Sequence, residues 1–90
     1  MSSMQSQPSL GADIIKVLRV VTVEAVDGYT LMERTGLDAD ALAKALEELV
    51  GRHLVDVKGN VAPSSVGTAY VFVPPGLRGD AVNLLRYAKL

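Results

Sequence analysis

The sequence predicts a small, mainly helical α+β domain, and three observations carry that prediction. Apolar residues recur at helical spacing in several segments, and two of these flank a glycine turn at Gly36. Two short apolar runs, at residues 54–58 and 69–73, are separated by a stretch of Gly, Asn, Pro, Ser and Thr, which indicates a β-hairpin. Another amphipathic segment follows the Pro-Pro-Gly at residues 74–76. Ninety residues support one core. From the local sequence signals we divide the chain into a disordered lead (1–8), a core domain (9–75) and a C-terminal helix (76–90).

The first helix is predicted from about Leu10 to Glu24, with Ser9 as its cap. The apolar positions that share one face are Ile14, Leu18, Val21 and Ala25. The segment at residues 20–26 is rich in β-branched side chains and also alternates as a strand does. A helix is favoured there, and a strand is the alternative.

The second helix is predicted to be short and to follow a turn at residues 27–28, after a brief edge strand at Tyr29. Thr30 and Glu33 have the spacing of a capping box, in which each side chain bonds to the backbone N–H of the other residue. Gly36 ends this helix, because glycine adopts the left-handed conformation that such ends require.

The third helix is predicted to begin at the cap Asp38, with Asp40 in its first turn, where negative charge is favourable. Its expected buried side consists of Leu42, Ala45, Leu46, Leu49 and Val50. Its expected outward side consists of Ala39, Asp40, Ala43, Lys44, Glu47 and Gly51, with Glu48 at the border. The two hairpin strands are predicted at Leu54 to Lys58 and at Ala69 to Val73.

The segment from Thr30 to Val57, together with the hairpin that ends at Val73, resembles the winged helix-turn-helix domain of small prokaryotic transcription regulators. The resemblance implies three helices, a two-stranded wing and an additional C-terminal helix. It also implies a small DNA-binding regulator, in which the third helix enters the major groove of double-stranded DNA and the wing contacts the backbone. The candidate DNA-binding residues are Lys44, Arg34, Lys58, Asn60, Ser64, Ser65 and Thr68.

The charge of this region favours a different function. Six acidic residues and two basic residues lie between Asp27 and Glu48, and the formal net charge of the whole chain is −1. Phosphate neutralisation by Lys and Arg supplies much of the affinity of DNA-binding proteins. The alternative is therefore a winged-helix protein-interaction module that does not bind DNA and uses its acidic third helix or its C-terminal helix. A third interpretation assigns the acids to helix capping and an ordinary solvated face.

The C-terminal helix has an apolar stripe that must pack on its own domain or on a second copy of the chain. The candidate dimerisation residues are Leu77, Ala81, Leu84, Leu85 and Ala88. We expect a homodimer, because terminal helices commonly join such regulators. Arg78, Arg86 and Lys89 make this helix basic, which is also compatible with a membrane surface; the stripe is too short to favour that.

Several classes of function are disfavoured by composition. The chain contains no cysteine, and His53 is its single histidine, so we expect no metal site, no cofactor and no enzymatic activity. The N-terminal residues lack the basic and apolar regions of a secretory signal. The apolar stretch at residues 14–26 is interrupted by Lys16, Arg19 and Glu24, so it is not a transmembrane helix. We expect a cytoplasmic protein without a membrane partner.

Overall fold

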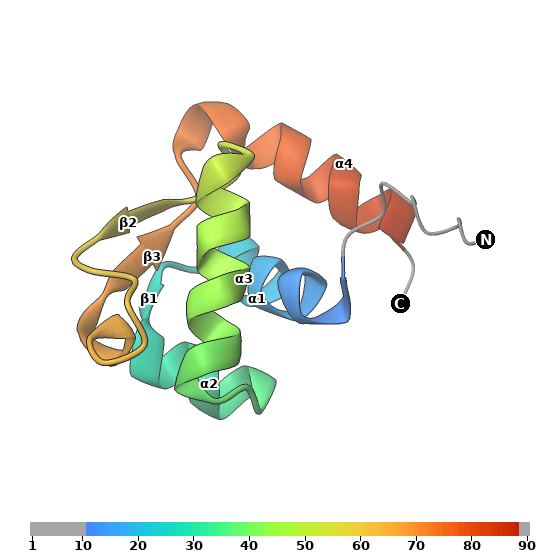
Figure 1. Cartoon of the computed structure of the whole chain (residues 1–90). Helices are drawn as coiled ribbons and strands as arrows, with labels where there is room; N and C mark the ends of the chain where they lie inside the picture. The colour runs from blue at the N-terminus through green and yellow to red at the C-terminus, as the bar shows by residue number, and fades with distance from the viewer. Residues whose placement is uncertain (1–10, 89–90) are drawn as a thin grey trace.

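The computed structural model describes residues 11–88, which form a mainly helical domain with one small antiparallel sheet (Figure 1). The predicted disordered lead (1–8) and the predicted cap Ser9 lie outside the described residues. The elements in chain order are α1 (Ala12–Val23), β1 (Val26–Asp27), α2 (Gly28–Thr35), α3 (Ala39–Gly51), β2 (Asp56–Lys58), the 3-10 turn η2 (Val66–Thr68), β3 (Tyr70–Phe72), the 3-10 turn η3 (Pro75–Leu77) and α4 (Arg78–Ala88). The mainly helical α+β class is confirmed, and the arrangement is compatible with a winged helix.

Helix α1 is the central helix of the domain, because α2, α3 and α4 all pack against it. Its N-cap residue is Gly11, which has extended backbone angles. The predicted stripe is partly wrong: Ile14 is only partly buried and Ala25 lies beyond the helix. The buried apolar residues are Ile15, Val17, Leu18 and Val21. Contact with helices on more than one side widens the buried face beyond the single stripe that the spacing indicates.

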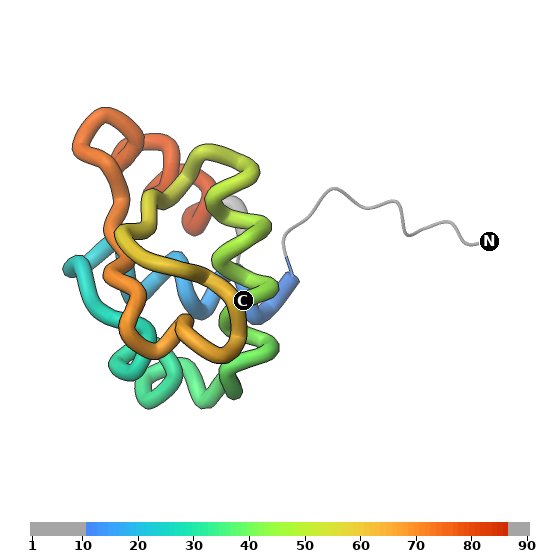
Figure 2. Tube along the Cα trace, turned by 60° about the vertical axis from the view of Figure 1, so that its left-hand side comes forward, coloured from blue at the N-terminus to red at the C-terminus, as the bar shows by residue number. Residues whose placement is uncertain are grey.

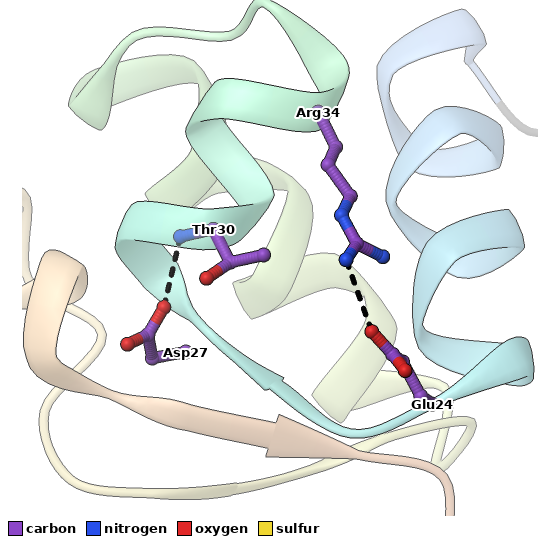
Figure 3. A network of polar contacts seen from close by, with 4 residues as sticks. All are labelled: Glu24, Asp27, Thr30 and Arg34. Carbon is purple, nitrogen blue, oxygen red and sulfur yellow. Dashed lines mark hydrogen bonds and ion pairs between the residues drawn. The ribbon is translucent and has the colours of Figure 1, made fainter.

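Helix α2 begins earlier than predicted, and its cap is Asp27 rather than Thr30. The Asp27 Oδ1 accepts a hydrogen bond of 2.8 Å from the amide of Thr30 (Figure 3). The predicted capping box of Thr30 and Glu33 is therefore wrong, and so is the edge strand at Tyr29, which lies in the first turn of α2. An aspartate three residues before the bonded amide caps a helix as well as a threonine does, and pairing of β1 with β3 places Asp27 at that position.

Helix α3 follows the predicted pattern most closely. Gly36 has a φ of 77°, and Asp38 caps the helix by accepting a 2.8 Å hydrogen bond from the amide of Ala41. Leu42, Leu46 and Leu49 are fully buried, as predicted. Two positions are wrong: Val50 is 38% exposed, and Ala43 is buried instead of facing outward.

The sheet has three strands in the order β1-β3-β2. The strand β1 joins the two strands of the predicted hairpin, and it lies before the position at Tyr29 where a brief edge strand was predicted. Val26 pairs with Val71, and Val71 pairs with Val57, so valines form the inward row of the sheet. Both hairpin strands are shorter than the predicted runs, and β1 was not predicted at these residues. In the edge strand β2, Asp56 Oδ1 accepts a 2.9 Å hydrogen bond from the amide of Val57.

The β2–β3 loop (residues 59–69) folds back onto the domain instead of projecting from it (Figure 2). Val66 in η2 is fully buried and belongs to the core. Its carbonyl oxygen lies so close to Gly28 that a Cβ on this glycine would meet it at 1.8 Å. A Cβ on Gly67 would likewise lie 2.6 Å from the ring of Tyr29. The two glycines therefore permit a close approach of the loop to the start of α2.

Helix α4 packs against α1 at one end of the domain (Figure 1). Ala81 is fully buried, and the Arg78 guanidinium donates a hydrogen bond to the backbone carbonyl of Thr22 near the end of α1. Leu77, Leu84 and Leu85 are partly buried against the same core. The apolar stripe of this helix is thus used at least in part within its own chain.

Candidate functional site

The exposed surface of α3 is the first candidate site, because the sequence analysis predicts that this helix recognises DNA or a protein partner. Asp40, Lys44, Glu47 and Glu48 are all exposed along this helix. Glu48 accepts a hydrogen bond of 2.9 Å from the Nε of Arg52, one turn further along. Lys44 thus lies between carboxylates on both sides, and the surface as a whole is acidic.

A depression of about 490 Å³ separates this surface from the β2–β3 loop. Its walls are Asp40, Ala43, Lys44 and Glu47 on α3 and Asn60, Val61, Ala62 and Pro63 on the loop. The loop beside Ala43 explains why this residue is buried. Two predicted site residues, Lys44 and Asn60, are brought together here. The Asn60 side chain is used locally, since its Oδ1 accepts a 2.8 Å bond from the amide of Ala62.

The other loop candidates are spread along the hairpin. Lys58 is exposed on β2 opposite Tyr70, and Ser64 is exposed in the loop. Ser65 is half-buried, and its carbonyl accepts a 3.0 Å bond from the Thr68 hydroxyl. Neither Ser65 nor Thr68 lines the depression with Lys44 and Asn60.

Arg34 lies apart from these residues on α2. Its Nη2 is 3.1 Å from Glu24 Oε2 in the connection between α1 and β1 (Figure 3). Both side chains are about half exposed, so the ion pair contributes little to stability. It nevertheless turns Arg34 toward α1 rather than toward the loop.

A groove of about 630 Å³ between the start of α1 and the outer side of α3 is a second candidate, which the sequence analysis missed. Its residues are Gly11, Ala12, Asp13 and Ile14 from α1 and its cap, and Asp38, Asp40, Ala41, Lys44, Ala45 and Glu48 from α3 and its cap. The spacing of residues in one helix carries no signal for such a groove, since it is created by packing of two distant segments.

The carboxyl group of Asp27 has a lowered pKa. Hydrogen bonds from the Thr30 side chain and then from the Thr30 amide hold the pKa of this carboxyl below its usual 3.8. The shift reflects helix capping, so it marks a structural residue rather than a reactive one.

His53 adopts a left-handed conformation, with a φ of 60°, in the turn between α3 and β2. Its amide donates a 2.9 Å bond to the carbonyl of Val50, and the residue is exposed. Among residues 11–88, no group of three or more His, Asp or Glu side chains is placed to hold a metal ion.

The predicted dimerisation residues are only partly available at the surface. Ala81 is buried within the chain, and the side chain of Ala88 lies outside the described part of the structure. Leu84 and Leu85 are half-buried, and Val82 beside them is 38% exposed. Over the described residues, no helix has the length and apolar character needed to cross a membrane.

No protein-family model matches the chain, and no curated protein or solved structure matches it either.

Proposed function

We propose that this chain is a winged-helix protein-interaction module that presents the exposed surface of α3 to a basic protein partner. The charge of that surface is the observation that carries the proposal. Asp40, Glu47 and Glu48 are exposed around the single Lys44. DNA would bring its phosphates against the Asp40 and Glu47 carboxylates and the Glu48–Arg52 ion pair, whereas a basic protein segment would find complementary charge at the two acids.

We also propose that the fold is a winged helix. This assignment is supported by the order α1-β1-α2-α3-β2-β3 and by the position of β3 between β1 and β2. Fold does not define function, so the choice of partner rests on the surface and not on the resemblance. The proposed module is not an enzyme and requires no cofactor.

A DNA-binding regulator is the second candidate, and one observation favours it. Lys44 of α3 and Asn60 of the loop line the same depression, so a helix and a wing could approach one duplex together. Lys58 is exposed on the neighbouring strand. A homodimer joined through the exposed part of α4 would bring two such sets of residues together.

Substitution of Lys44 by Glu distinguishes the two functions. The interaction module predicts a higher affinity for a basic peptide, whereas the regulator predicts a lower affinity for DNA. We would titrate a labelled mixed-sequence duplex and a labelled Lys-rich peptide with the protein at low salt, using fluorescence anisotropy. The interaction module predicts peptide binding that becomes tighter in Lys44→Glu, and no duplex binding. Duplex binding that weakens steeply with salt and is lost in Lys44→Glu would overturn the proposal in favour of the regulator.

A further inference from the structure

The groove between α1 and α3 combines an apolar floor with charged walls. Ile14 from α1 and the two alanines Ala41 and Ala45 from α3 form the floor. Ala41 and Ala45 are one helical turn apart, and their short side chains leave space where longer ones would fill it. The resulting volume of about 630 Å³ is in the range of clefts that hold a ligand or an anchoring side chain.

Carboxylates lie on both sides of this floor. Asp13 is on α1, while Asp40 and Glu48 are on α3, where they lie two turns apart. At a rise of about 1.5 Å per residue, these two positions are about 12 Å apart along the helix. The helix dipole accounts for acids in the first turn, such as Asp13 and Asp40. Glu48 lies in the second half of α3, where its carboxylate pairs with Arg52 at 2.9 Å.

Among the described residues that line the groove, Lys44 is the one basic side chain, midway between Asp40 and Glu48. Within the described part of the chain it forms no ion pair shorter than 4.0 Å, whereas Glu48 is paired with Arg52. A cationic occupant therefore meets an excess of carboxylates, the repulsive Lys44 ammonium group and, at Glu48, a carboxylate that it shares with Arg52.

We infer that this groove is the docking site for a short basic amphipathic helix of a protein partner. The inference rests on the proposed function and specifies its partner. An apolar side chain of the partner occupies the floor at Ile14, Ala41 and Ala45. Lys or Arg residues two turns apart in the partner lie beside the Asp40 and Glu48 carboxylates, which is the helix-in-groove mode of recognition.

The test uses a fluorescein-labelled helical peptide made of Lys, Leu and Ala. Its lysines are two helical turns apart and lie on the same face of the peptide helix as its leucines. Ala41→Phe fills the groove and is expected to weaken binding by about tenfold or more. Ala62→Phe is the matched control, since Ala62 lines the separate depression beside the loop. It should bind as the unmodified protein does. Thermal unfolding followed by circular dichroism shows whether each variant is folded.

Charge substitutions extend the test to the walls. Asp13→Lys should weaken peptide binding several-fold, and Lys44→Ala should strengthen it. Glu47→Lys is the comparison variant: Glu47 faces the loop depression and does not line the groove, so this substitution should weaken binding less than Asp13→Lys does. If Glu47→Lys abolishes binding while Ala41→Phe and Asp13→Lys have no effect, the peptide binds the loop side of α3. That result overturns the groove inference and leaves the proposed function intact.

Two further outcomes would also overturn the inference. A peptide in which Ser replaces every Leu should bind at least about tenfold more weakly; binding as tight as that of the Leu peptide would mean that the floor takes no apolar anchor. Spermine at the concentration of the peptide should displace little of it, because spermine has no apolar anchor; equal potency of the two would have the same meaning. Absence of any peptide binding, with salt-dependent duplex binding, would overturn both the groove inference and the proposed function.

Discussion

Helix α3 and the β2–β3 loop lie side by side, yet different interactions hold them in place. In α3 the fully buried side chains repeat with the helical period, at Leu42, Leu46 and Leu49. The loop has two fully buried side chains, Val66 and the small Ala69, and a close backbone approach to Gly28. Burial in α3 is therefore spread over many side chains, whereas the position of the loop depends on a few contacts that a single methyl group can disturb.

The largest expected effect is on the α3 side of this comparison. Leu46→Ala removes a fully buried side chain and leaves a cavity, so it should lower the free energy of unfolding by about 2–5 kcal/mol. Urea unfolding followed by circular dichroism measures this change. Leu46→Met is the control and should cost less than about 1.5 kcal/mol. Equal losses in the two variants would contradict the close packing of α3.

The loop side is tested by Gly28→Ala, which places a Cβ against the Val66 carbonyl. We expect a loss of about 1–3 kcal/mol and faster hydrogen exchange in the β2–β3 loop. Gly51→Ala is the matched control: its Cβ meets nothing within 4 Å, and alanine should stabilise α3 by about 0.5–1 kcal/mol. Unchanged exchange in Gly28→Ala would show that the loop does not depend on this contact.

The cap of α3 should have a smaller effect than either of these. Asp38→Ala removes the acceptor for the Ala41 amide and should cost about 1 kcal/mol in chemical unfolding. Asp38→Asn keeps an oxygen acceptor at this position and should be nearly neutral. If Asp38→Asn lowers the free energy of unfolding as much as Asp38→Ala does, the charge of Asp38 and not its hydrogen bond stabilises the helix.

The smallest effect is expected from the cap of α2 and appears only in acid. The pKa of Asp27 is lowered in the folded state, so this group stabilises the fold above pH 3.8. That contribution is lost as the pH falls from 3.8 through the lower folded-state pKa. Asp27→Asn should reduce the fall in melting temperature over this range and leave its value at pH 7 almost unchanged. An identical acid profile in both proteins would assign the acid sensitivity to other groups.

Local signals in the sequence predicted α3 well and α2 poorly. For α3 the cap, the apolar period and the glycine before it all agree, and each acts within a few residues. For α2 two capping patterns compete, one from Asp27 and one from Thr30 with Glu33. Pairing of Val26 and Asp27 with β3 decides between them, and that contact joins residues far apart in the sequence.

The surfaces also differ in whether neighbouring residues or contacts between distant segments determine them. The acidic character of exposed α3 follows from the order of its residues, since Asp40, Lys44 and Glu47 lie on one side of any helix through them. The burial of Ala43 and the existence of the groove do not follow from it. They depend on where the loop and α1 lie against α3, which no spacing within α3 indicates.

The sequence by itself determined the mainly helical α+β class, the limits and cap of α3 and the acidity of its exposed side, because helical period, capping and charge act over a few neighbouring residues. Only the tertiary structure decided the position and pairing of the third strand, the inward fold of the loop against Gly28 and the packing of α4 on α1. These features depend on contacts between distant segments, in which backbone pairing and shape select one arrangement among several that the local pattern allows.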